Sequence, residues 1–218
     1  MSAAPEATLL LAPGCPYCPQ VLAALSELVK QGVLGRLEVV NIAVHPEAAE
    51  AVGTRSVPWI RIGPYELTGN HGAAELRQWA ERAARGEGIA AWYHDALQGG
   101  RLQEALARVK RNPEELEDLL GLLEHPPGDE ELPITVRIGI SAIVEDLAGT
   151  ELLKRVRPML ERLTRSPEAA TRADAAHYLG LVGDPSVASI LRPLTEDEAE
   201  QVREIAREAL ESVGHTIH

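Results

Sequence analysis

The spacing of apolar residues along the chain changes character before its midpoint. In the first part, short runs alternate between two patterns. Residues 7–12 form an apolar run closed by Pro13-Gly14, which predicts a strand buried on both faces. From Pro16 onward apolar residues recur at helical spacing, so we expect a helix that ends at Gly32.

The elements that follow complete one sheet. Residues 36–44 are rich in β-branched side chains and predict a second strand, after which His45-Pro46 open a short helix. Residues 59–62 and 65–68 predict a hairpin, and an amphipathic helix follows near residue 76. The order β-α-β-α-β-β-α predicts a minimal α/β domain, with helices available for both faces of the sheet.

From Ile89 to the end, the pattern is helical. Glycine and proline divide it into helices of roughly ten to eighteen residues, and no strand pattern stands out. Three helices share a similar pattern around Arg137, Arg172 and Arg203, which lie 35 and then 31 residues apart. A period in this range is typical of an α-solenoid.

Each repeat places apolar residues at matching positions after its arginine. They are Ile140, Ile143, Val144 and Leu147 in the first repeat, Ala175, Tyr178, Leu179 and Val182 in the second, and Ala206, Ala209, Leu210 and Val213 in the third. One unit is too small to bury such a face alone, so neighbouring units should stack. The three arginines would then form a ridge, used either for ion pairs between helices or for ligand binding.

Length and pattern together predict two domains. A chain of 218 residues is long enough for two cores. We place an α/β domain at residues 1–88 and an all-α repeat domain at residues 89–218.

Charge and hydropathy narrow the choice of partners and of compartment. The formal net charge is -12, and residues 96–218 carry most of it, with 14 Lys and Arg against 23 Asp and Glu. Nucleic acid and anionic membranes are therefore not expected as partners. No basic stretch precedes a long apolar run near the start, so we expect a soluble, cytoplasmic protein.

The two cysteines of the chain lie in one short motif. Cys15 and Cys18 stand in the sequence GCPYCP, where the first strand meets the first helix. The nucleophile in disulfide exchange is a thiolate, and the free N–H groups and dipole of a helix N-terminus stabilise such an anion. Cys18, one turn further on, is close enough to attack a mixed disulfide at Cys15.

The GCPYCP motif resembles the active site of the thioredoxin superfamily, and most of all the CPYC signature of glutaredoxins and glutaredoxin-like protein disulfide oxidoreductases. The segment Arg55-Ser56-Val57-Pro58 is similar to the family's cis-proline loop. The resemblance covers residues 7 to 84.

The resemblance implies specific roles for these residues. Cys15 and Cys18 would be catalytic, and the Val57–Pro58 bond would be cis, with the Val57 backbone pairing with bound substrate. Tyr17 would shape the rim of the site.

The resemblance also implies thiol chemistry without a cofactor or metal. Glutaredoxins that use glutathione usually carry a lysine three residues before the first cysteine, where this chain has Ala12. We therefore expect a glutathione-independent dithiol mechanism.

Several alternatives stay open for these residues. The CxxC pair could be half of a zinc site, although a second cysteine pair is missing, or could hold an iron–sulfur cluster that bridges two chains. The domain could also bind partners without any redox role. Trp59 could line the substrate groove or fill the core, and His45 and His71 are interpreted as surface or helix-capping residues.

The second half resembles HEAT repeats of the short, phycobilisome-lyase-like sort. Arg172, Leu179, Gly183, Asp184 and Pro185 fall on the pattern of those repeats. The resemblance implies that Asp184 caps the next helix. The acidic cluster at residues 196–200 is interpreted as the first turn of a helix, with docking of a basic partner as the alternative.

The sequence thus predicts a cytoplasmic thiol–disulfide oxidoreductase. Its helical half would bind a protein substrate or partner, and an unidentified dithiol would supply electrons. The alternative is a non-catalytic assembly scaffold in which the thioredoxin-like fold only binds partners.

Overall fold

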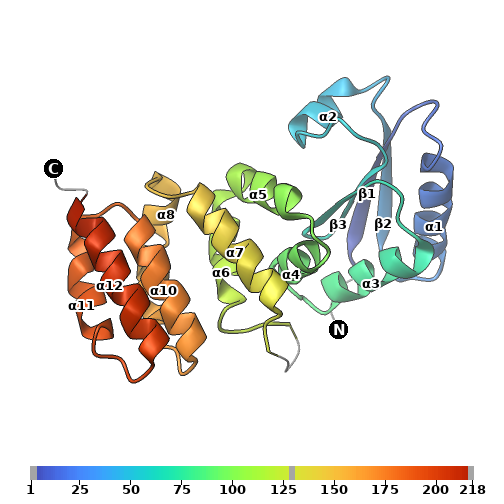
Figure 1. The fold of residues 1–218 in the computed structure, drawn as a ribbon. Helices are drawn as coiled ribbons and strands as arrows, with labels where there is room; N and C mark the ends of the chain where they lie inside the picture. Colours follow the sequence, from blue (N-terminus) through green and yellow to red (C-terminus); the bar gives the residue numbers. More distant parts are fainter. Residues whose placement is uncertain (1–3, 128–130, 216–218) are drawn as a thin grey trace. The chain divides into compact units, whose positions relative to one another are not determined.

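The structure is a computed structural model that describes residues 4–127 and 131–215. It divides after residue 89 into two compact units (Figure 1). The fold of each unit is described separately below.

The first unit has the predicted order of elements, β-α-β-α-β-β-α. They are β1 (Glu6–Leu11), α1 (Cys18–Lys30), β2 (Arg36–Asn41), α2 (Pro46–Ala51), β3 (Trp59–Ile62), β4 (Tyr65–Thr68) and α3 (Ala73–Ala84). The four strands form one sheet in the order β2-β1-β3-β4. β1 and β2 are parallel, and the other pairs are antiparallel.

One face of this sheet is apolar, and α1 and α3 cover it. Strand register places Leu9, Ile60 and Leu67 on the same side, and all three are buried. The ring of Tyr65 lies 4.7 Å from that of Trp79 on α3, which anchors the helix to this face. The opposite face is more polar.

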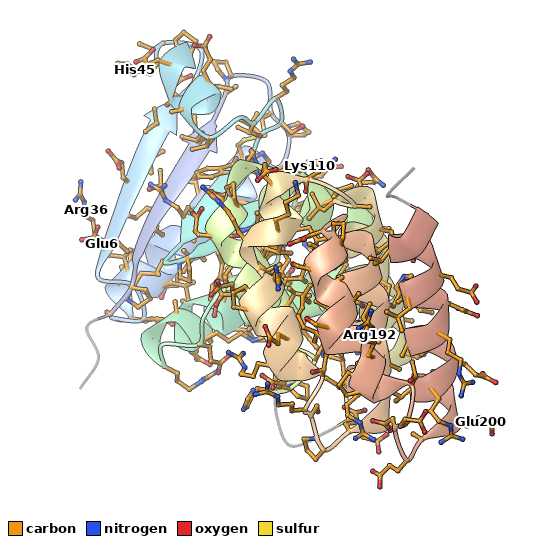
Figure 2. All side chains as sticks on the ribbon, turned by 90° about the vertical axis from the view of Figure 1, so that its left-hand side faces the viewer. Glu6, Arg36, His45, Lys110, Arg192 and Glu200 are labelled. Atoms are coloured by element: carbon orange, nitrogen blue, oxygen red, sulfur yellow. A yellow bond between two sulfur atoms is a disulfide. The ribbon has the colours of Figure 1, made fainter. Side chains whose placement is uncertain are left out.

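Helices were expected on both faces, but α2 has no buried residue, although Leu10 and Trp59 on the second face are each 2 % exposed. On that face Glu6 of β1 and Arg36 of β2 form an exposed ion pair with 3.8 Å between charged atoms (Figure 2).

Two element boundaries differ from the sequence prediction. β2 ends at Asn41 instead of residue 44, because the Asn41 side chain accepts a hydrogen bond from the N–H of Ala43 and its carbonyl accepts one from His45. Such a local side-chain turn ends a strand. α1 begins at Cys18 instead of Pro16, since the chain still turns between Ala12 and Cys15.

The described residues of the second unit form helices and the turns that connect them. Its elements are α4 (Ala90–Gln98), α5 (Leu102–Arg111), the 3-10 turn η1 (Pro113–Glu115), α6 (Leu116–Gly121), α7 (Ile134–Asp146), α8 (Glu151–Arg155), α9 (Arg157–Leu163), α10 (Ala169–Leu181), the 3-10 turn η2 (Pro185–Val187), α11 (Ala188–Leu194) and α12 (Glu200–His215). Several are shorter than the ten to eighteen residues expected. A proline in the first turn of α9, for example, separates it from α8.

The three predicted repeats form the stacked helices of this unit. α10 packs against α7 on one side and against α12 on the other, α9 lies beside α10, and α11 lies beside α12 (Figure 1). The predicted apolar positions are buried, except Leu210, which is half-buried. A Cβ built at Gly180 would lie 3.0 Å from the Cβ of Ala209, so glycine is what allows α10 and α12 to approach this closely.

The arginine ridge consists of ion pairs between successive repeats. Arg137 on α7 pairs with Asp174 on α10 and with Glu168, 3.0 Å away. Arg172 on α10 makes two 2.9 Å hydrogen bonds to Asp197, in the turn that precedes α12. The ion-pair interpretation is therefore correct for Arg137 and Arg172, whereas Arg203 donates to backbone carbonyls instead of to a carboxylate.

Turns of this unit are also stabilised by Arg203, by Asp184 and by the acidic cluster at residues 196–200. Arg203 donates to the carbonyls of Asp197 and Glu198, at 2.7 and 2.9 Å. Asp184 accepts from the N–H of Ser186 at 2.9 Å, which confirms its capping role. Asp197 accepts from the N–H of Ala199 at 2.9 Å. The acidic cluster was expected to form the first turn of a helix, but α12 begins only at Glu200, so residues 196–199 form the turn that leads into it.

The ion pair between Arg172 and Asp197 should contribute measurably to the free energy of unfolding. Both side chains are largely buried, with 9 % and 10 % exposed. Arg172→Ala should lower the free energy of unfolding by about 2 to 3 kcal/mol, because it leaves a buried carboxylate without its charged donor. Urea unfolding followed by circular dichroism measures this.

Lys154→Ala is the matched control. Lys154 forms an exposed pair with Glu151, with 40 % and 85 % of the side chains exposed. Its loss should change stability by less than about 1 kcal/mol. Equal effects of the two substitutions would contradict the proposed importance of the buried pair.

The buried hydroxyl of Tyr65 should make the stability of the protein depend on pH in the alkaline range. Its hydroxyl donates to the carbonyl of Glu87 at 2.6 Å, and burial raises the pKa of Tyr65 to about 12 from its usual value of 10.0. A raised pKa means that this stabilisation is complete below pH 10.0 and is lost as the pH rises toward about 12.

Tyr65→Phe should lower stability by about 1 kcal/mol at neutral pH. This deficit should shrink above pH 10.0, where the wild-type protein alone loses the contribution of Tyr65. Urea midpoints of both proteins, measured across this range, test the expectation. A constant difference would be inconsistent with it.

Candidate functional site

Two loops leave the same edge of the sheet. β1 ends at Leu11, and its neighbour Leu10 pairs with Trp59, the first residue of β3. Because β1 and β3 are antiparallel, the segment after Leu11 and the segment before Trp59 emerge at one edge. The CxxC motif lies in the first segment and the Val57–Pro58 bond in the second.

A tight turn delivers Cys15 from the strand to the helix. Gly14 has a positive φ of 80°, a conformation that favours glycine, and the N–H of Cys15 donates to the carbonyl of Ala12 at 3.3 Å. Gly14 is a positioning residue; the sequence placed it at the end of a strand and in the GCPYCP motif, without a role of its own. The available signal was the Pro13-Gly14 pair directly before the cysteine.

The two cysteines differ in accessibility. They are joined by a disulfide, with their Cα atoms 5.5 Å apart. Cys18 is the first residue of α1 and is only 4 % exposed, whereas Cys15 lies outside the helix and is half-buried. An incoming group therefore reaches Cys15 more readily than Cys18.

The start of α1 provides a favourable environment for negative charge at Cys15. The N–H of Cys18 donates to the Sγ of Cys15 at 3.2 Å. The N-cap residue, Tyr17, makes no capping hydrogen bond through its side chain, and the first turn of the helix contains no acidic residue. The sulfur thus receives a backbone hydrogen bond and the positive end of the helix dipole, with no carboxylate of that turn opposing it.

The second loop has the geometry that the resemblance implied. The Val57–Pro58 peptide bond is cis, which confirms that expectation. Pro58 is buried, and its carbonyl accepts from the N–H of Gly69 at 2.9 Å, which ties the start of β3 to the end of β4. Val57 is half-buried, and no described residue hydrogen-bonds to its backbone.

Tyr17 and Trp59, the aromatic residues predicted at the site, occupy different environments. Tyr17 precedes the first residue of α1 and is 50 % exposed. Trp59 is 2 % exposed, so of its two open interpretations the structure favours the core. The guanidinium of Arg61 lies 5.8 Å from the centre of the Trp59 ring.

The two histidines of the first unit make local polar contacts. His45 lies 3.0 Å from Glu47, and His71 lies 2.8 Å from Glu75 and 3.2 Å from the carbonyl of Thr68. Within residues 4–127 and 131–215, no three His, Cys, Asp or Glu side chains gather as a metal site would require. No described helix is long and apolar enough to span a membrane.

Comparison with known protein families agrees with this architecture. Residues 7–81 match the family model for a thioredoxin domain, and residues 140–211 match that for HEAT repeats. No curated protein matches the chain. The chain therefore combines a thioredoxin-like α/β domain, which carries a close cysteine pair, with a HEAT-like helical repeat domain.

The difference in burial predicts a difference in alkylation. After reduction with dithiothreitol, limiting iodoacetamide should label Cys15 roughly tenfold faster than Cys18, since Cys15 is more open and the N–H of Cys18, 3.2 Å from its sulfur, would stabilise its anion. Peptide mass spectrometry measures the ratio. In guanidinium chloride the two rates should converge, and faster labelling of Cys18 in the folded protein would contradict the assignment.

Proposed function

We propose that this protein is a thiol–disulfide oxidoreductase in which Cys15 attacks and Cys18 resolves. The observation that carries the proposal is the 3.2 Å hydrogen bond from the N–H of Cys18 to the Sγ of the more accessible Cys15 at the start of α1. It supports a stabilised thiolate at Cys15, with its resolving partner one turn away.

The proposed reaction proceeds in two exchanges. The Cys15 thiolate attacks one sulfur of a substrate disulfide, forms a mixed disulfide and releases the other substrate sulfur as a thiolate. The Cys18 thiolate then attacks the Sγ of Cys15, closes the Cys15–Cys18 disulfide and releases the second substrate thiol. Two electrons pass to the substrate, and an external dithiol returns the pair to its reduced form.

The substrate is proposed to lie between the two loops. Val57 has backbone groups available for hydrogen bonds to an extended segment of the substrate, and Pro58 packs below it. Tyr17, two residues after Cys15, contributes an exposed ring. Trp59 supports this region from the core.

The HEAT-like domain is proposed to bind a protein, as HEAT repeats generally do, and so to select the substrate or partner. A cytoplasmic location is proposed with it, since reducing conditions there allow a cysteine pair to cycle.

Substitution of each cysteine tests this mechanism. With dithiothreitol as reductant, Cys15→Ser should lower the rate of peptide disulfide reduction to the uncatalysed rate, because no nucleophile is left at the accessible position. Cys18→Ser, first reduced and then freed of dithiothreitol, should instead accumulate a mixed disulfide with the peptide, visible as an added mass. Ser26→Ala, on the same helix, should retain the wild-type rate.

A redox titration separates the oxidoreductase from a scaffold that only binds. In glutathione buffers the Cys15–Cys18 pair of an oxidoreductase should interconvert reversibly between dithiol and disulfide, as judged by alkylation and mass. A wild-type protein that reduces no disulfide, or a pair that stays oxidised in excess dithiothreitol, would favour the scaffold.

A further inference from the structure

The exposed aliphatic side chains of the helical unit gather on one face of α7. Ile134 and Ile138 are 68 % and 61 % exposed, and they are the exposed large apolar side chains described in residues 90–218. They lie one turn apart on the same side of the helix, and Ala142 continues the row. Single exposed apolar residues are ordinary on a protein surface, whereas contiguous exposed apolar patches mark interaction sites.

A groove runs beside this row. It has a volume of about 280 Å³, and its walls come from the end of α4, the start of α5 and α7; the lining includes Leu97, Leu102, Thr135, Ile138, Gly139 and Ala142. A Cβ at Gly139 would lie 2.7 Å from Leu97, so glycine allows α4 to approach α7 and to form the floor. The volume is below the roughly 300–1,000 Å³ of small-molecule sites, and suits one or two protein side chains.

The charged groups around the groove are dominated by acids. Glu145 follows Ile138 by two turns on the same helix face, and its side chain is 57 % exposed. Glu131, just before α7, is also exposed. On the α5 side, Glu104 is 55 % exposed.

The neighbouring arginines do not make the net charge around the groove positive. Arg101 contacts two carboxylates, Asp95 at 3.2 Å and Glu104 at 3.5 Å. Arg137 likewise pairs with both Asp174 and Glu168. Each of these two cations is thus paired with two acids, so the named side chains around the groove carry a net negative formal charge.

From these observations we propose that the groove beside Ile134 and Ile138 is a docking site for a protein segment that presents bulky aliphatic residues flanked by lysine or arginine. The inference rests on the proposed partner-binding role of the HEAT-like domain and names the surface and the chemistry of that partner. The aliphatic residues would fill the groove, and the flanking cations would face Glu131, Glu145 and Glu104.

A second copy of the chain fits this surface poorly. A symmetric pairing of α7 with itself about Ile138 would bring Glu145 of one copy toward Glu131 of the other. It would also join two units of the same negative sign. Charge therefore favours a basic partner over self-association.

Fluorescence anisotropy with defined peptides tests the proposal on the full chain. The probe is a labelled alanine-rich helical peptide that carries two leucines one turn apart, with lysines on both flanks. One matched peptide replaces the lysines by glutamates, and another replaces the leucines by serines. We expect binding of the lysine-flanked peptide alone, with an affinity that falls as salt is added.

The double substitution Ile134→Ser and Ile138→Ser should weaken binding of this peptide by about tenfold or more. Both residues are exposed, so the fold should persist, which circular dichroism checks. Val44→Ser is the matched control, since Val44 is 67 % exposed and lies in the other unit. Glu145→Gln should weaken binding and flatten its salt dependence.

Several outcomes would overturn the proposal. They are absence of binding to the lysine-flanked peptide, equal binding of the glutamate-flanked peptide, and equal losses in the Val44→Ser and double-isoleucine variants. A dimer in analytical ultracentrifugation that the double-isoleucine variant disperses would assign the groove to a second copy. Anisotropy needs no thiol chemistry, so a chain without reductase activity can still pass this test, and an active reductase can fail it.

Discussion

The hydrogen bond between the N–H of Cys18 and the Sγ of Cys15 links the fold of the first unit to its chemistry. It exists because a turn at Gly14 brings the chain from the end of β1 to the start of α1 without adding Cys15 to the helix. The sulfur therefore occupies the place of a helix-capping acceptor. The sheet holds this arrangement in place. β1 leads into the turn, and the cis Val57–Pro58 bond directly precedes β3 at the same edge of the sheet.

The helical unit is organised by a different interaction. Its repeats bury aliphatic and alanine side chains between helices, and a chain of arginine–carboxylate pairs at their ends joins one repeat to the next. These pairs engage Arg137 and Arg172 with carboxylates, which leaves their charges neutralised within the unit. The groove beside α7 consequently lies in surroundings that are net acidic.

The two units thus offer complementary properties. The first presents an accessible sulfur beside an exposed backbone loop, which suits chemistry on many disulfides. The second presents an apolar groove with acidic surroundings, which suits recognition of a particular segment. In the proposed function, the second unit would select the partner and the first unit would carry out thiol–disulfide exchange on it.

The sequence by itself determined the order of elements, the hairpin at residues 59–68, the helical repeats and the cysteine pair. These follow from local properties, namely the spacing of apolar residues, the positions of glycine and proline, and a short motif. The apolar positions after Arg137, Arg172 and Arg203 could be predicted because helical spacing alone selects them.

Only the tertiary structure decided which groups meet. It showed that Cys18 begins α1, that Trp59 lies in the core, that the arginines pair with acids, and that α4 and α7 leave a groove at Ile138. Such contacts join residues that are distant in the chain, or depend on where a turn places a backbone N–H. The pattern of apolar and polar residues defines the face of each element, whereas packing against its neighbours determines what that face touches.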